Sequence, residues 1–197
     1  MRRVVLVALL ACGCDNRFEA RVGGAILPQA MGTIDLPAGA TTVVVTRGAN
    51  PVLPSGPVQL AIDVDVPWSQ VATLVRTAPR PALVVGDRDR LRGFVLEDEL
   101  DNVRTLKVTA NAKGKFCMSP PGADEAYCVE SGDRRHISAA FVRDVLQQAV
   151  REYDLHQAWV IPTPDLAWAD LVRTIDGVRT CCRQPVKVAL PPPRPAD

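Results

Sequence analysis

Long hydrophobic runs and a surplus of charge are both missing from this chain of 197 residues. A helix needs about 20 consecutive apolar residues to cross a membrane, and the apolar run at Val4–Leu10 is far shorter. The 23 Lys and Arg nearly balance the 22 Asp and Glu, and no basic cluster stands out, so the sequence predicts no nucleic-acid partner. A hydrophobic content of 47% is enough for the core of one domain or of two small ones.

Residues typical of catalytic sites are also scarce. The two histidines, His136 and His156, have no nearby serine or cysteine arrangement of a nucleophilic site, so we interpret them as surface or cap residues. Gly23-Gly24 precedes no Lys-Ser/Thr pair and forms no phosphate-binding loop. The sequence therefore predicts a protein that is not an enzyme and has no cofactor or metal.

The N-terminus carries an export signal. Arg2-Arg3 is followed by an apolar run and by Leu9-Leu10-Ala11-Cys12, the layout of a secretory signal peptide. The last four residues resemble the lipobox of bacterial lipoproteins, which implies cleavage after residue 11 and acylation of Cys12. Cys14 is the alternative acylation site, and an ordinary cleaved signal is the other interpretation. We expect a signal peptide over residues 1–11, a tether over 12–39 and a lipid-anchored body on the periplasmic side of a bacterial membrane, inner or outer.

Export places the body in an oxidising compartment, where disulfides persist. Four cysteines follow the tether: Cys117, Cys128, Cys181 and Cys182. They allow three pairings, of which a Cys117–Cys128 bridge across a turn-rich hairpin is preferred. A vicinal Cys181–Cys182 ring is the less common alternative. Metal binding is disfavoured, because no second Cys or His pair lies at ligand spacing.

One strand–helix–strand pattern organises the second half. Trp168, Leu171, Val172 and Ile175 form an apolar stripe at helical spacing, between predicted strands at 158–161 and 186–190. Asp165 is expected to cap this helix at its start, and Gly177 is expected to end it in the left-handed conformation.

The same pattern occurs earlier in the chain, where Asp65 and Trp68 precede a second apolar stripe between predicted strands at 58–64 and 82–85. This predicts an α+β fold with two βαβ-like units, a possible internal repeat, and a mixed sheet packed against two to three helices. The halves span 40–105 and 106–190, with a Pro-rich tail at 191–197. Both aspartates are interpreted as helix-entry residues rather than an acid–base pair. Core packing is favoured for both tryptophans over stacking on a sugar or on a partner.

The order of elements in the second half resembles the periplasmic domain of the ExbD/TolR family of biopolymer-transport proteins. The resemblance rests on Ile137-Ser138 before a helix, the strand at 159–161, the turn Asp165–Trp168, and the stop at Asp176-Gly177. It implies a module that dimerises, binds a partner protein or contacts peptidoglycan. Members of that family have a transmembrane helix that contains a carboxylate. This sequence has no segment that corresponds to that helix, so we expect no proton conduction.

These observations together predict a non-enzymatic envelope lipoprotein that acts as a protein-interaction or scaffold module, in connection with a proton-driven transport system. Its expected partners are an envelope protein or a second copy of the chain. The lipid is expected to attach the protein to the membrane. A module that binds peptidoglycan or a small ligand is the alternative function.

Overall fold

The computed structural model describes residues 19–78, 81–94, 96, 105–122, 124–132, 137–153, 157–181 and 187–189. Within these ranges the chain forms three helices and three sheets, so the predicted α+β class is confirmed. The elements in chain order are β1 (Arg21–Val22), β2 (Ala25–Ile26), β3 (Thr41–Val45), β4 (Val58–Ile62), α1 (Trp68–Thr77), β5 (Ala82–Asp87), β6 (Arg90–Phe94), β7 (Leu106–Ala110), β8 (Lys115–Ser119), β9 (Tyr127–Glu130), α2 (Ala139–Tyr153), β10 (Gln157–Pro162), α3 (Trp168–Arg179) and β11 (Lys187–Ala189). No helix in the described part of the chain is both long and apolar enough to cross a membrane.

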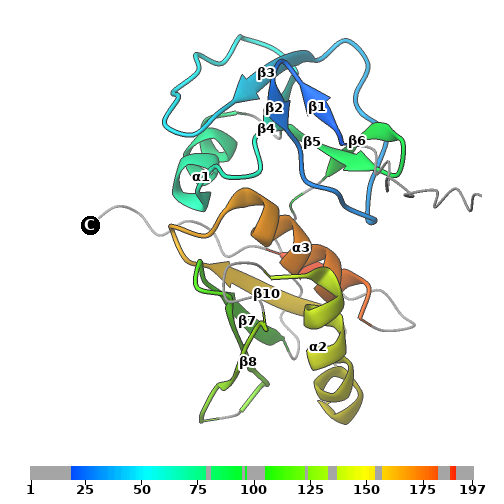
Figure 1. Cartoon of the computed structure of the whole chain (residues 1–197), viewed down its shortest axis with the longest axis vertical. Coiled ribbons are helices and arrows are strands. Elements are labelled where there is room, and N and C mark those ends of the chain that lie inside the picture. Colours follow the sequence, from blue (N-terminus) through cyan, green and yellow to red (C-terminus); the bar gives the residue numbers. More distant parts are fainter. Residues whose placement is uncertain are drawn as a thin grey trace, which may run out of the picture.

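Each half of the chain contributes one mixed sheet. The upper sheet in Figure 1 has the strand order β3-β4-β5-β6, and the lower sheet has the order β11-β10-β7-β8-β9. In the upper sheet β3, β4 and β5 are parallel and β6 is antiparallel. In the lower sheet β11, β10 and β7 are parallel, and β8 and β9 continue it as an antiparallel hairpin.

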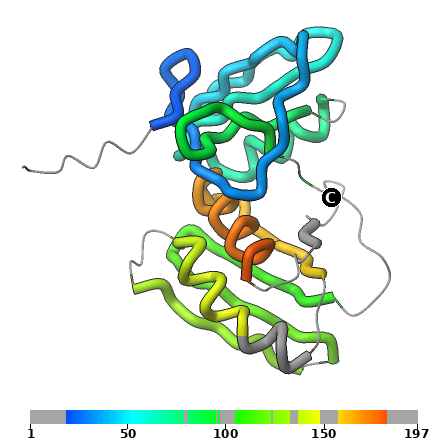
Figure 2. The backbone as a smooth tube through the Cα atoms, turned by 90° about the vertical axis from the view of Figure 1, so that its right-hand side faces the viewer, coloured from blue at the N-terminus to red at the C-terminus, as the bar shows by residue number. Residues whose placement is uncertain are grey.

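Helix α3 lies between the two sheets, as Figures 1 and 2 show from two directions. Ten of its residues are buried, including the polar side chains of Asp170, Thr174 and Asp176. One continuous hydrophobic cluster contains side chains from both sheets and from α1, α2 and α3. The two halves therefore share a core, and the central helix carries apolar side chains on more than one face because both sheets cover it.

Residues 19–36 are not the loose tether that the sequence predicts. Strands β1 and β2 pair around Gly23-Gly24, whose positive φ angles suit a tight turn. Ala20, Ala25 and Leu27 are buried against Ala61 and Val84 of the upper sheet. This segment covers the sheet face opposite α1, so the upper sheet is buried on both faces. The prediction failed because small apolar residues without helical or strand periodicity are compatible both with a linker and with a segment that covers a sheet.

Helix α2 packs closely against α3 at a glycine. Ser138 Oγ accepts a hydrogen bond of 3.1 Å from the Phe141 N–H, which confirms the predicted cap at the start of α2. Gly177 does not end α3 as expected, because the helix continues to Arg179. A Cβ atom at Gly177 would lie 2.7 Å from the Ala139 carbonyl oxygen. The glycine is therefore needed for close approach of the two helices rather than for a left-handed turn.

Replacing this glycine should loosen the helix pair. In Gly177→Ala the added methyl group overlaps both the Ala139 carbonyl and Val142 Cβ, the latter at 2.7 Å. Alanine is intrinsically better than glycine within a helix by about 1 kcal/mol, but overpacking costs about 1–3 kcal/mol, so we expect a net loss of about 1–2 kcal/mol. Urea unfolding measures this change in the free energy of unfolding. Gly132→Ala is the control, since no atom lies within 4 Å of a Cβ there; an equal effect in both variants would contradict the explanation.

Candidate interaction surface

The two Asp-x-x-Trp turns that the sequence singles out meet each other in the structure. Pro67 lies opposite Ala167 in an antiparallel bridge. Four backbone N–H groups donate across this junction: Trp68 to Leu166 O (2.8 Å), Ser69 to Pro164 O (2.9 Å), Trp168 to Val66 O (2.8 Å) and Ala169 to Val64 O (3.1 Å). Each bond has a counterpart with the roles of the halves exchanged. Such reciprocity is the pattern of a two-fold interface, here formed within one chain.

The two aspartates of these turns do not cap their helices, so that expectation is wrong. The N-cap residues are Pro67 and Ala167, neither with a side-chain cap. Asp65 and Asp165 lie two residues earlier and are exposed; Asp165 accepts a hydrogen bond of 2.6 Å from Thr163 Oγ1. Because carbonyls of the opposite turn accept the first N–H groups of each helix, no capping side chain is needed.

The two tryptophans lie at different depths. Trp168 is 0% exposed and packs edge-on against Phe94 of the upper sheet, with 6.4 Å between ring centroids and 83° between planes. Trp68 is half-buried and packs at the margin of the core. The Trp168 indole N–H is buried and has no hydrogen-bond partner among the described residues. The Trp168 side chain therefore links the halves by apolar packing, in addition to the hydrogen bond of its backbone N–H.

A buried carboxylate, which sequence reasoning missed, fastens the N-terminal segment to α3. Asp176 is 3% exposed, and its Oδ1 accepts hydrogen bonds of 3.0 Å from the backbone N–H groups of Met31 and Gly32. One turn on, the Arg179 guanidinium lies 4.8 Å from the centroid of the Phe94 ring. The available signal was that Asp176 follows Trp168 and Val172 at helical spacing, on the apolar stripe of α3, but the sequence does not show which backbone groups it binds.

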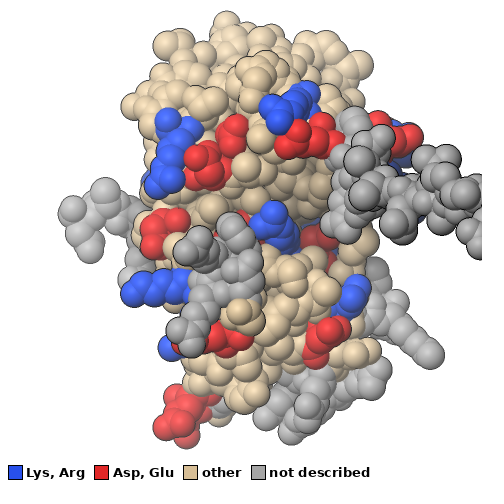
Figure 3. Space-filling model, in the orientation of Figure 1, with Lys and Arg blue, Asp and Glu red and all other residues tan. Residues whose placement is uncertain are grey.

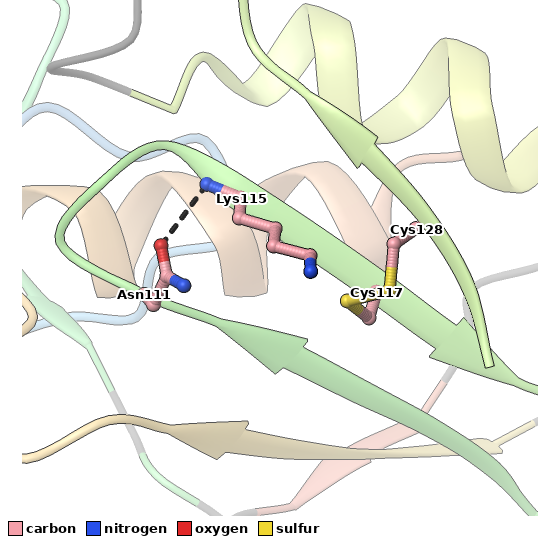
Figure 4. Close-up of a disulfide and its surroundings, with 4 residues drawn as sticks. All are labelled: Asn111, Lys115, Cys117 and Cys128. Carbon is pink, nitrogen blue, oxygen red and sulfur yellow. Dashed lines mark hydrogen bonds between the residues drawn. A yellow bond between two sulfur atoms is a disulfide. The ribbon is translucent and has the colours of Figure 1, made fainter.

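The predicted disulfide between Cys117 and Cys128 is present. The two residues lie directly opposite each other on β8 and β9, with a Cα–Cα distance of 4.1 Å. Figure 4 shows the bridge and Lys115 on the side of β8 that faces away from α3. In the turn between β7 and β8, Asn111 Oδ1 accepts a hydrogen bond of 3.1 Å from the Lys115 N–H. The disulfide thus joins β8 to β9, and the Asn111 side chain stabilises the turn that joins β7 to β8.

The lower sheet has one face covered by helices and one without a cover in the described part of the chain. Along β7 and β8, buried side chains that point to the helices alternate with partly or fully exposed ones, and in β10 the buried Ala158 and Val160 alternate with the half-buried Trp159 and the exposed Ile161. We call the second set the open face; it consists of Lys107, Thr109, Lys115, Cys117, Ser119, Trp159 and Ile161, together with Cys128 and Glu130 of β9, which lie opposite Cys117 and Lys115. Trp159 lies beside Lys107, and Ile161 beside Thr109. The upper sheet differs, because its outer face is covered by residues 19–36.

Surface charge does not single out another site. On the face of the molecule in Figure 3, acidic and basic side chains are interspersed. Among the described residues no ion pair forms at Lys107 or Lys115, but the exposed Glu130 of β9 lies directly opposite Lys115 on the same face. The open face therefore combines an aromatic ring, an aliphatic side chain and charges of both signs.

The remaining predicted site residues lie elsewhere. Cys181 is buried near the end of α3. Cys12, Cys14, Cys182, His136 and His156 lie outside the described residues. Comparison with protein-family models, with curated proteins and with solved structures finds no match to this chain.

Proposed function

We propose that the protein is a non-enzymatic envelope lipoprotein whose folded body docks a partner protein, as an ExbD/TolR-like interaction module. The observation that supports this most strongly is the open face, on which Trp159 and Ile161 stay accessible although they belong to central strand β10. Aromatic residues are enriched in protein interfaces, and charged side chains typically surround such contacts. The disulfide between β8 and β9 holds these two strands in register at the edge of this surface.

The link to the ExbD/TolR family has its own support. The second half runs β7, the β8–β9 strands, α2, β10, α3 and β11, which is the order that the resemblance implies. The first half has a strand–turn–helix–strand of the same kind at β4, α1 and β5, and residues 46–57 join β3 to β4 where the second half has β8, β9 and α2. A partner in a proton-driven transport system follows from this resemblance.

Site-specific crosslinking tests the docking surface. A photoreactive amino acid at Ile161 should yield an adduct in living cells, with a membrane subunit of a proton-driven motor identified by mass spectrometry. The same amino acid at Val52, which is 93% exposed and far from the open face in sequence, should yield none. Equal adducts from both positions, or none from Ile161, would contradict the proposal.

Peptidoglycan binding is the second candidate, favoured by Trp159, because an exposed indole can stack on a sugar ring. Sedimentation with isolated sacculi separates the two functions. A protein-docking module should stay in the supernatant. Binding that Trp159→Ala abolishes would instead favour the peptidoglycan function.

The lipid anchor makes a separate prediction. Cys12→Ala should abolish incorporation of labelled palmitate and release the protein from the membrane fraction, because anchoring depends on several acyl chains at one residue. Cys14→Ala should leave labelling unchanged. If labelling depends on Cys14 instead, Cys14 is the acylated residue. If neither variant affects labelling, the proposed lipid anchor at these cysteines is contradicted.

A further inference from the structure

The two halves differ at one edge of their sheets. In each half, three parallel strands lie side by side, and a helix connects the second strand to the third: β3, β4, α1 and β5 above, and β7, β10, α3 and β11 below. Beyond β7 the lower sheet continues with the antiparallel strand β8. Beyond β3 the upper sheet has no further strand among the described residues. The position that β8 fills in one half is therefore open in the other.

Hydrogen bonds define which backbone groups of β3 face outward. Thr41 N–H donates to Pro57 O, and Val45 O accepts from Asp63 N–H, both at 2.9 Å. Alternation along a strand then directs residues 41, 43 and 45 toward β4, and the N–H and C=O groups of Thr42 and Val44 outward. In the described part of the chain these outward groups form no backbone–backbone hydrogen bond.

The edge lacks the features that normally prevent strand pairing. Strand β3 is Thr-Thr-Val-Val-Val, an uncharged β-branched sequence without proline. Strand β6, at the opposite edge of the same sheet, carries Arg90 and Arg92 and is bridged at Gly93 by Ile34. The sheet is therefore protected at one edge and open at the other.

We propose that β3 of a second copy of this chain adds antiparallel to β3 and joins the two upper sheets into one. A two-fold axis at Val43 places Val43 opposite its copy in a pair without hydrogen bonds. Thr42 then exchanges two backbone hydrogen bonds with Val44 of the second copy, and Val44 exchanges two with Thr42. All four outward N–H and C=O groups of each β3 are used, and no like charges meet, so the strand is complementary to itself.

The expected dimer is weak and depends on concentration. Pairing through a strand of five residues contributes only part of the roughly 1,200–2,000 Å² that stable interfaces bury. Detection therefore requires a method that traps the pair in the full chain at the membrane.

Disulfide trapping gives a test that is specific for register. In an antiparallel pair without hydrogen bonds the Cα atoms lie about 4.5 Å apart, within the range for a disulfide. Val43→Cys should therefore give a dimer of the full chain under mild oxidation, on a non-reducing gel. Thr41→Cys is the matched control: its two copies would lie four residues out of register, about 13 Å apart, and should not crosslink. The native chain controls for the other cysteines.

A charged variant provides a second measurement. The dimer can be measured by chemical crosslinking with a reagent that does not react with lysine. Thr42→Lys should reduce the amount of crosslinked dimer at least several-fold, because two ammonium groups would meet at the paired edges. Val52→Lys adds the same charge on an exposed residue away from β3 and should have no effect. No dimer from Val43→Cys, equal dimer from Thr41→Cys, or an adduct with a different protein would each overturn the proposal.

Discussion

Trp168→Ala is expected to remove a large part of the stability of the protein. The side chain is fully buried between the two sheets and contacts Phe94 of the other half. Truncating a buried tryptophan costs about 3–5 kcal/mol, through lost transfer free energy and the cavity left behind. Because whole domains are stable by only about 5–15 kcal/mol, this variant should unfold at much lower urea concentration, as followed by circular dichroism.

Trp68→Ala is the control, since it removes the same atoms from the matching turn. Trp68 is only half-buried, so we expect a clearly smaller loss of stability. Trp168→Phe keeps most of the apolar volume and removes the indole N–H that has no partner, so it should be milder than Trp168→Ala. Equal losses for Trp68→Ala and Trp168→Ala would contradict the different depths of the two rings.

Asp176→Ala is expected to release the N-terminal segment from α3. The variant leaves the N–H groups of Met31 and Gly32 without the acceptor they share, in hydrogen bonds that are partly buried. Hydrogen bonds to a charged group contribute about 1.5–3 kcal/mol each, and solvent can reach the freed groups once the segment moves away. We therefore expect a loss of about 3 kcal/mol in the free energy of unfolding, together with faster proteolysis between residues 27 and 36.

Two further variants isolate the cause. Asp176→Asn keeps an Oδ1 acceptor and should retain part of the stability. Asp165→Ala removes an exposed carboxylate that accepts a hydrogen bond from the nearby Thr163 hydroxyl, and should change stability by less than about 0.5 kcal/mol. If proteolysis between residues 27 and 36 is unchanged in Asp176→Ala, the carboxylate does not hold this segment.

Local patterns in the sequence predicted much of the fold. The apolar stripe that begins at Trp168 predicted α3, alternating residues predicted a strand near β4, and a short apolar run predicted a strand near β10. Ser138 was correctly predicted as a cap, and Cys117 and Cys128 as a pair. These features succeed because each depends on residues close together in the chain, or on a hairpin that brings them together.

Features that depend on contacts between the halves were not predictable in this way. Asp165 has the position of a helix cap in the sequence, but the opposite turn already accepts the first N–H groups of α3. Gly177 has the position of a helix stop, but contact with α2 gives it another role. The open face at Trp159 and Ile161 was also missed, because an apolar run at β10 fits a strand covered on both faces as well as one covered on a single face.

Backbone amide exchange at Trp68 and Trp168 tests most directly whether the two halves form one unit joined at their turns. Each of these N–H groups donates to a carbonyl of the other half, at 2.8 Å in both cases. We predict that both amides exchange as slowly as those of β4 and β10, and that low denaturant accelerates all of them together, because they open only with the whole domain. Rapid exchange at either tryptophan while the strands remain protected would contradict the account.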